Sequence, residues 1–365
     1  MQLIDSRSQS YVWSERFERS AADIFDVQDE ITLRIAEELS VELLAYERNG
    51  VLKRFTDDIG AHKWYLKGVH YWNQRRREGM RLCRHCFEKA IEQDSGYVLP
   101  YVALADFYTI SAFYGFLPPD RSFPEAHRLL SRALLIDSGF GAAHSSLGFA
   151  TFLYDWDWAA SRKCFRQALA LNPNHPTTNV WYALCLSWAG EADEAMDRAE
   201  RAYLSDPISP LVGTTRGVLL YQRHQYGCAS EQFRRVLQAH PDYTLAHAHL
   251  ARALILDGQY EQAAFHGMTA SRLGQPFAEV FAAFASARAG EPGRAETAIQ
   301  DLLKSARKEY VSPLSIAYLY VALGDRANAL RWFGEAKRIR DPLLCQARAD
   351  PRFTEFRSAP ELQAT

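Results

Sequence analysis

Side chains that often carry chemistry occur in several short clusters of this sequence, and the first cluster is a Cys-x-x-Cys pair. Cys83 and Cys86 have the spacing of a redox dithiol or of half a zinc site. No second pair of cysteines or histidines stands at ligand spacing from them. Cys83 falls where other copies of a repeat, described below, carry a small alanine. We therefore favour ordinary buried thiols that pack between helices.

The densest histidine group is His240, His247 and His249. Two residues that are two positions apart on a helix lie about 200° apart around its axis, so His247 and His249 cannot bind one ion from one face. We interpret these histidines as packing or solvent-facing residues. The sequence thus predicts no metal site.

Asp155 and Asp157 alternate with tryptophans and have the look of paired carboxylates. No basic or nucleophilic partner lies near them in the sequence. We expect them to cap a helix and to help pack Trp156 and Trp158 into a turn.

Motifs that cradle phosphates are missing, because the chain has no G-x-x-x-x-G-K-[ST] and no strand-linked G-x-G-x-x-G. The G-x-S-x-G motif that presents a nucleophilic serine is absent too. Arg75, Arg76 and Arg77 are the only run of basic residues, and we interpret it as a solvated turn rather than a nucleic-acid site. The sequence therefore predicts a protein that is not an enzyme and that uses no cofactor, small-molecule substrate or nucleic acid.

Composition places the chain among ordinary globular proteins. Of its 365 residues 48% are hydrophobic and 24% are charged, and the net charge is −2, so no global field attracts phosphate or anionic lipid. Six cysteines are scattered through a chain that starts without a secretory signal, and no apolar run approaches the length of a spanning helix. We expect reduced thiols, no membrane partner and a cytoplasmic location.

A fixed repeat organises most of the chain. Pro173, Pro207 and Pro241 are spaced 34 residues apart, and alanines at 195, 229 and 263 keep the same step. Within one copy, Leu250, Ala251 and Leu254 recur at helical spacing before Asp257-Gly258 breaks the helix, and a second helix follows. Each copy is therefore predicted to be a helical hairpin, with proline turning the chain into the next one.

This pattern resembles the tetratricopeptide repeat, whose order of aromatic, Gly, Ala, Phe, Ala and Pro residues it matches. The last copy carries it in full, at Ala317, Tyr320, Gly324, Ala329, Phe333, Ala336 and Pro342. Two earlier copies are expanded, one around Trp64 and Phe87 and one around Tyr108 and Ala126. The resemblance implies an all-α fold, a right-handed superhelical solenoid of about eight helical hairpins over residues 61–341.

The amino-terminal residues do not follow the repeat. Residues 2–5 and 11–17 alternate like two strands of a β-hairpin, and a helix is predicted from Asp26, with apolar residues at four-residue steps. The string from Gln2 to Ile31 resembles the carboxyl edge of a TolB-like domain. That domain belongs to bacterial multidomain regulators in which a winged-helix or nucleotide cyclase domain precedes a tetratricopeptide tail.

The resulting division has four parts. Residues 1–25 are a remnant of the TolB-like domain, 26–60 a linking amphipathic helix, 61–341 the repeat array, and 342–365 a capping segment with a short helix near Thr354–Gln363. Two similar strings, Trp156-Asp157-Trp158 and Asp350-Pro351-Arg352-Phe353, support the same group of regulators. The resemblance implies either the tail of a longer regulator or a stand-alone adaptor.

The resemblance also implies a binding surface, because the first helix of each tetratricopeptide hairpin lines a concave groove that holds a peptide. Mapping by phase gives the groove positions Phe149, Phe152, Trp188, Tyr221, Arg252, Phe284, Arg288 and Tyr318. Such a groove would suit a protein or peptide with apolar anchors and an acidic group. The alternative is that several of these aromatic residues pack between hairpins. The positions that a carboxylate clamp requires are apolar here, for example Val180 and Leu184.

The sequence as a whole predicts a protein-interaction scaffold, the repeat tail of a bacterial signalling or transcriptional regulator. The alternative is the regulatory half of a class III adenylate cyclase-type protein whose catalytic domain is not in this chain.

Overall fold

The computed structural model describes residues 54–73, 77–275 and 278–363, together with residues 2–4, 11–14 and 31. Strands β1 (Gln2–Ile4) and β2 (Tyr11–Ser14) pair antiparallel, with Leu3 opposite Trp13, so the predicted hairpin is present. The rest of the expected TolB-like remnant, most of the linking helix and Arg75–Arg76 lie outside the described residues.

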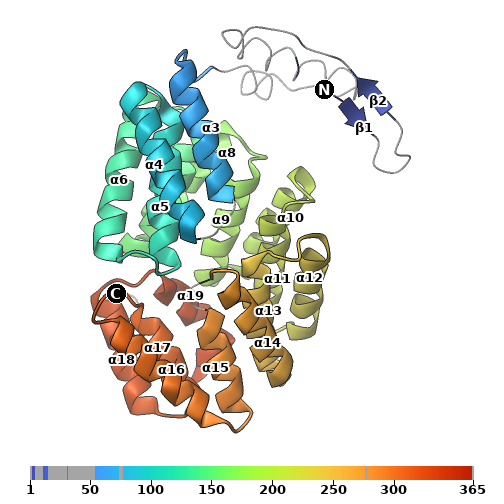
Figure 1. The fold of residues 1–365 in the computed structure, drawn as a ribbon, viewed down its shortest axis with the longest axis vertical. Coiled ribbons are helices and arrows are strands. Elements are labelled where there is room, and N and C mark those ends of the chain that lie inside the picture. Colours follow the sequence, from blue (N-terminus) through green and yellow to red (C-terminus); the bar gives the residue numbers. More distant parts are fainter. Residues whose placement is uncertain are drawn as a thin grey trace.

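Eight helical hairpins follow one another in the described part of the chain (Figure 1). They are α3 and α4 (Ile59–Asn73, Arg77–Gln93), α5 and α6 (Val98–Phe113, Pro119–Ile136), α7 and α8 (Gly141–Ala150, Trp158–Leu171), α9 and α10 (Pro176–Trp188, Ala192–Ser205), α11 and α12 (Pro210–Gln222, Tyr226–Ala239), α13 and α14 (Thr244–Leu256, Tyr260–Arg272), α15 and α16 (Ala278–Arg288, Pro292–Ser305), and α17 and α18 (Pro313–Ala322, Arg326–Arg338). This confirms the all-α solenoid and its eight units.

The two helices of a hairpin have different surfaces, and the difference follows from the sequence. First helices such as α11 bury residues around most of their circumference, because they contact helices on both sides. Second helices such as α12 bury one stripe, Ala229, Ser230, Phe233 and Val236. Prolines begin α9 and α11, where the missing N–H costs nothing. Glycines end several first helices with positive φ, for example Gly190 at 90° and Gly258 at 73°.

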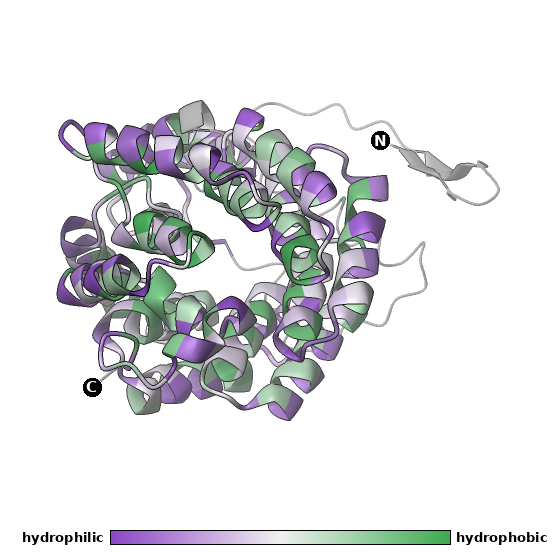
Figure 2. Cartoon of the chain, turned by 90° about the horizontal axis from the view of Figure 1, so that it is seen from below, coloured by the Kyte–Doolittle hydropathy of each residue, from purple (hydrophilic) through white to green (hydrophobic). Residues whose placement is uncertain are grey.

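The hairpins curve around an axis (Figure 2). The chain after α18 returns to the middle of the array, where Figure 1 labels α19. After α18 the chain forms a short helix, α19 (Leu343–Ala349), which packs against α9 as well as α18. The Sγ of Cys345 lies 3.6 Å from the carbonyl oxygen of Phe152. The Arg340 guanidinium lies over the rings of Tyr154 and Trp156. The eighth hairpin is thereby tied to the third.

The closing helix expected near Thr354–Gln363 is not where the sequence placed it. The helix is α19, and a 3-10 segment, η3 (Pro351–Phe356), follows it. Pro351 prevents α19 from continuing, and the Asp350 carboxylate accepts a hydrogen bond from the Arg352 N–H at 3.0 Å to cap the new turn. Phe353 and Phe356 are then buried against Phe333 of α18.

Close packing inside the hairpins depends on glycine at a recurring position, which gives a first prediction. A Cβ atom on Gly217 of α11 would stand 2.4 Å from the Phe233 ring of α12, and Gly68 faces Phe87 in the same way. Gly217→Ala is expected to lower the free energy of unfolding by about 1–3 kcal/mol, because Phe233 has no free space to move into. Urea unfolding followed by circular dichroism measures the change.

Gly227→Ala in α12 is the matched control, since nothing lies within 4 Å of the added methyl group. This change is expected to be neutral or to stabilise the protein by up to about 1 kcal/mol, because alanine is the better helix former. Equal stability of the two variants would contradict the packing argument.

Candidate functional site

The eight groove positions predicted from the sequence all lie on first helices or their extensions. Phe149 is on α7, Phe152 is on the π-helical turn that extends α7 (Thr151–Asp155), Trp188 is on α9, Tyr221 is on α11, Arg252 is on α13, Phe284 and Arg288 are on α15, and Tyr318 is on α17. Seven of them are at most 8% exposed, and Arg288 is exposed. The first helices and their extensions therefore carry all of the predicted positions, and all but Arg288 have little of their surface open.

For Tyr221, Arg252, Phe284 and Tyr318 the reason is that the chain's own carboxyl-terminal segment lies on them. We call residues 343–356, which comprise α19, Asp350 and η3, the carboxyl-terminal plug. The Asp350 carboxylate accepts hydrogen bonds from the Tyr221 hydroxyl at 2.7 Å and from the Arg252 guanidinium at 2.6 Å. Arg352 of the plug donates to the same carboxylate at 2.7 Å. All three side chains that meet Asp350 are buried.

The charged side chains at this contact are buried, and the Asp350 carboxylate pairs with the guanidinium groups of both Arg252 and Arg352. Burial by itself raises the pKa of the Asp350 carboxyl, but the Arg352 and Arg252 guanidinium groups outweigh it and hold that pKa well below its usual range. Burial and the Asp350 charge raise the pKa of Tyr221. Burial and the nearby Arg252 lower the pKa of His249, whose Nδ1 lies 3.0 Å from the Arg252 Nη1.

The aromatic positions of the predicted groove contact the same plug. The Tyr318 and Phe353 rings stack with centroids 4.7 Å apart. The Arg352 guanidinium lies 5.1 Å from the Tyr318 ring and 5.5 Å from the Phe284 ring. This half of the concave side, from α11 to α17, is thus filled by a segment of the same chain.

The other half of the concave side holds an open cavity of about 480 Å³. Six helices and the turn residues beside them line it, and we call this set the open groove: Trp72, Asn73, Asp106, Ile110, Phe113, Tyr114, Phe149, Thr177, Trp181, Leu184, Ser209, Pro210, Leu211, Tyr243 and Leu245. Its wall is aromatic and rigid, because Trp181 stacks on Phe149 with centroids 4.9 Å apart. Of the predicted positions, only Phe149 belongs to it.

The open groove is nearly uncharged. Asp106 is the one carboxylate or guanidinium residue among its lining residues. A second cavity of about 200 Å³ adjoins it, sharing Asp106, Thr177 and Trp181, and it adds the apolar side chains of Leu99, Val102 and Phe140. The two arginines that the sequence assigned to the binding surface are outside both cavities. The sequence predicted an aromatic binding surface that includes two arginines. The open groove is instead lined mainly by apolar side chains and contains one acidic residue.

Trp181 and Leu211 line the open groove but are not among the positions predicted from the sequence, although the repeat phase contains the signal. Trp181 comes seven residues before Trp188 on α9, which places it two turns earlier on a similar face. Helices α11 and α13 take part in both surfaces, because Tyr221 and Arg252 contact the plug while Leu211 and Leu245, nearer their amino-terminal ends, line the open groove.

The residues that could carry chemistry take structural positions. Cys83 and Cys86 are buried, and the Asp157 carboxylate caps α8 by accepting a hydrogen bond from the Ala160 N–H at 2.9 Å. Asp155 lies 3.3 Å from His127. His247 faces His266 rather than His249, with the two Nδ1 atoms 2.9 Å apart.

Two searches of the described residues gave negative results. In the described ranges no group of three or more His, Cys, Asp or Glu side chains is arranged to hold a metal ion. Among the helices of those same ranges, none is long and apolar enough to cross a membrane.

Comparison with known proteins identifies the repeat. Residues 151–210 and 214–266 match the family model of the tetratricopeptide repeat. The chain therefore contains tetratricopeptide repeats, which are protein-interaction modules, as the 34-residue period predicts.

Two curated relatives are bacterial proteins. A protein of Rhizobium meliloti strain 1021 named "Putative adenylate cyclase 3" is 28% identical over 204 residues, which are 53% of this chain and 27% of that protein. The transcriptional regulator HilA of Salmonella typhimurium is 23% identical over 165 residues, 45% of this chain and 30% of HilA. This chain thus matches less than a third of the length of either relative.

A solved structure supports the fold. The structure of a monomeric IFIT1 mutant with Gppp-AAAA aligns with a TM-score of 0.53 at 15% identity, over 86% of this chain and 76% of that chain. At that identity the likeness concerns the arrangement of helices alone.

Proposed function

We propose that these tetratricopeptide repeats form the protein-interaction tail of a bacterial signalling or transcriptional regulator, with the partner held in the open groove. The observation that carries the proposal is the groove itself, a cavity of about 480 Å³ walled by Phe149 and Trp181 and left open by the plug. The similarity to HilA supports the regulatory context. The tail acts as a non-enzymatic scaffold in the cytoplasm, the compartment of the regulators that the sequence resembles.

The chemistry of the open groove defines the partner that it accepts. Half-buried apolar side chains such as Leu184 and Leu211 offer contacts for apolar anchors. A peptide or helix with two or three apolar residues on one face meets this requirement. The Arg252 guanidinium takes no part in recognition, because Asp350 already neutralises it.

The second candidate is the regulatory half of a class III adenylate cyclase-type protein. The observation that favours it is the 28% identity to the Rhizobium meliloti protein, which extends over about half of this chain. In this case the open groove would bind a segment of the catalytic half or of a protein that controls it.

The groove is tested by placing a charge on its apolar wall. Leu184→Glu is expected to reduce photo-crosslinking of a partner at Tyr114 at least about tenfold, because the apolar anchors of the partner would desolvate the new carboxylate. The experiment carries a photo-reactive phenylalanine in place of Tyr114 in the source organism, and mass spectrometry identifies the adducts.

Leu204→Glu is the control, because this side chain is 75% exposed and lies outside the groove. It is expected to leave the crosslink unchanged. Equal crosslinking in the Leu184 and Leu204 variants would overturn the proposed groove. The identity of the adduct separates the two candidates, because a cyclase domain favours the second and a transcriptional regulator the first.

A further inference from the structure

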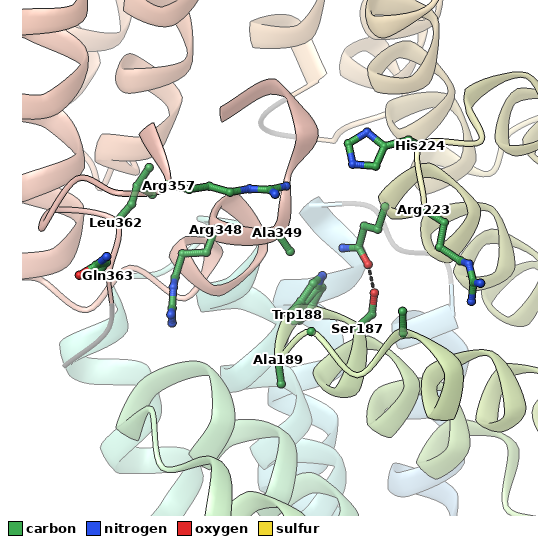
Figure 3. A pocket seen from close by; sticks show the side chains of 13 residues that line it. Ser187, Trp188, Ala189, Arg223, His224, Arg348, Ala349, Arg357, Leu362 and Gln363 are labelled. Atoms are coloured by element: carbon green, nitrogen blue, oxygen red, sulfur yellow. Dashed lines mark hydrogen bonds between the residues drawn. The ribbon is translucent and has the colours of Figure 1, made fainter. Parts of the chain in front are cut away.

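A cavity of about 560 Å³ lies outside the open groove, where the carboxyl-terminal segment meets two inter-helix turns (Figure 3). One turn joins α9 to α10 and contributes residues from Ser187 to Ala192. The other joins α11 to α12 and contributes Gln222, Arg223 and His224. The carboxyl-terminal segment closes the cavity with Arg348, Arg357 and Gln363. The plug, together with the residues that follow it up to Gln363, therefore completes this site by folding back.

The lining is rich in positive charge. Three arginines, Arg223, Arg348 and Arg357, line the cavity together with His224, and no aspartate or glutamate does. Arg223 turns outward to Asp193 at 3.0 Å, a carboxylate that is 95% exposed. Figure 3 shows the Arg357 side chain extending across the cavity toward the side where His224 lies. Arg348 and Arg357 thus bring two guanidinium groups to a lining without acidic residues, while Arg223 pairs with Asp193 outside it.

Two further donors belong to the same wall. Among the described residues, no acceptor pairs with the Trp188 Nε1 or the Gln222 Nε2, although both atoms are buried. The Ser187 hydroxyl donates to the Gln222 amide oxygen, which holds the amide nitrogen on the opposite side. Buried donors without partners are uncommon in folded proteins and call for an acceptor. The residues that line the cavity therefore include two with buried, unpaired N–H groups beside the guanidinium groups.

The shape of the aromatic wall selects among acceptors. The Trp188 ring packs against Phe113 with centroids 5.8 Å apart and against Phe152 with centroids 6.2 Å apart. Its indole is held by these neighbours, so it offers an N–H edge rather than a free face for stacking a nucleobase. A compact group of oxygen atoms fits these donors better than a flat ring.

We propose that this cavity binds a phosphoryl group, presented by a phosphorylated side chain of a partner peptide. A phosphoryl dianion carries three acceptor oxygens and pairs with several arginines at once, whereas a single carboxylate uses fewer of them. The volume leaves room for the residues beside the phosphorylated one. The site is separate from the open groove, so the inference goes beyond the proposed function and does not depend on it.

The test is calorimetric titration of the full chain with four probes. They are an acetylated alanine heptapeptide with a central phosphoserine, the same peptide with serine, the same peptide with glutamate, and inorganic phosphate. The phosphoserine peptide is expected to bind at least about tenfold more tightly than the serine and glutamate peptides. Binding tighter than that of inorganic phosphate assigns the source to peptides, and equal binding assigns it to free phosphate; either result supports the phosphoryl site.

Variants locate the binding. Arg348→Gln combined with Arg357→Gln is expected to weaken phosphoserine binding at least about tenfold, because both side chains are exposed and contribute charge rather than packing. Arg132→Gln removes an exposed arginine of α6 outside the cavity and is expected to change nothing. Trp188→Phe tests the indole N–H while keeping the contacts of the ring with Phe113 and Phe152, and it is expected to weaken binding severalfold.

Three results would overturn the proposal. They are no saturable binding of either phosphate probe, equal affinity for the glutamate peptide, and unchanged affinity in the double arginine variant. A circular dichroism spectrum and an unfolding midpoint equal to those of the unmodified chain show that each variant is folded, so that loss of binding is assigned to the cavity.

Discussion

Replacing Asp350 by alanine is expected to lower the free energy of unfolding by about 3–5 kcal/mol. The change leaves two guanidinium groups, those of Arg252 and Arg352, buried without a counter-charge. It also removes the acceptor of the Tyr221 hydroxyl and the cap of η3. Each loss acts in the same direction, because a buried polar group without a partner keeps its full desolvation cost. Urea unfolding at neutral pH measures the total.

Two controls separate the buried cluster from a general effect of removing an acid. Glu231→Ala breaks an exposed pair with Arg235, whose side chains are 63% and 67% exposed, and is expected to cost less than about 1 kcal/mol. The triple variant Arg252→Met, Asp350→Leu, Arg352→Met replaces the whole cluster with apolar side chains and is expected to recover most of the loss. A cost below about 1 kcal/mol for Asp350→Ala would show that the plug is not anchored by this carboxylate.

The anchored plug has a consequence for the way the array works. Isolated solenoids change curvature easily because each repeat contacts only its neighbours. Here Asp350 joins α11 to the end of the chain, and Cys345 contacts the backbone of Phe152. These contacts span 129 and 193 residues of sequence, so they fix the position of the third to fifth hairpins relative to the eighth. The open groove is thereby presented in one shape, which favours binding by reducing the ordering cost.

The sequence predicted the hairpins because their determinants are local and periodic. The small residue, the aromatic ring and the glycine of one copy recur 34 positions later. A copy that departs from the pattern at one position is therefore still recognised from the other positions. The same reasoning placed Tyr221 and Arg252 on inner helices. The direction in which a side chain leaves a helix depends on the position of its residue in the helical period, and a sequence repeat shows that position.

What lies against those inner residues could not be predicted in the same way. The partner of Arg252 is Asp350, 98 positions away, in a segment that does not follow the repeat. A single pairing at that distance leaves no periodic trace in one sequence. The sequence did mark the string around Asp350-Pro351-Arg352-Phe353, but only as a likeness to other regulators. The sequence therefore does not reveal that the plug covers one half of the groove and leaves the other half uncovered. Both features depend on how the whole chain folds.

A second large effect is expected at Asp341, which lies at the junction between α18 and the plug. Its carboxylate accepts hydrogen bonds from the Ser312 hydroxyl and, at 3.0 Å, from the Leu343 N–H. Burial nevertheless raises the pKa of Asp341 to about 6, since the side chain is 1% exposed. The folded protein thus holds this proton more tightly than the unfolded chain, whose aspartate pKa is near 3.9.

The sign of the pH effect follows from that difference. The contribution of protonated Asp341 to the free energy of unfolding is fully present below pH 4. It is lost as the pH rises through about 6, which lowers the free energy of unfolding by about 3 kcal/mol in total. Asp341→Asn keeps the shape and removes the charge, so it is expected to stabilise the protein by up to about 3 kcal/mol at pH 7.5 and to change little at pH 4. Urea unfolding of both proteins at each pH measures the difference.

Comparison of the two proteins is essential, because another group titrates in the same range with the opposite sign. Burial and the adjacent His247 lower the pKa of His266 to about 4, so the folded state loses stability as the pH falls from about 6.5 to 4. His266 is the same in both proteins, and its contribution cancels in their difference. Asp341→Asn that destabilises the protein at pH 7.5 would show that Asp341 is ionised and held by its hydrogen bonds, against the burial argument.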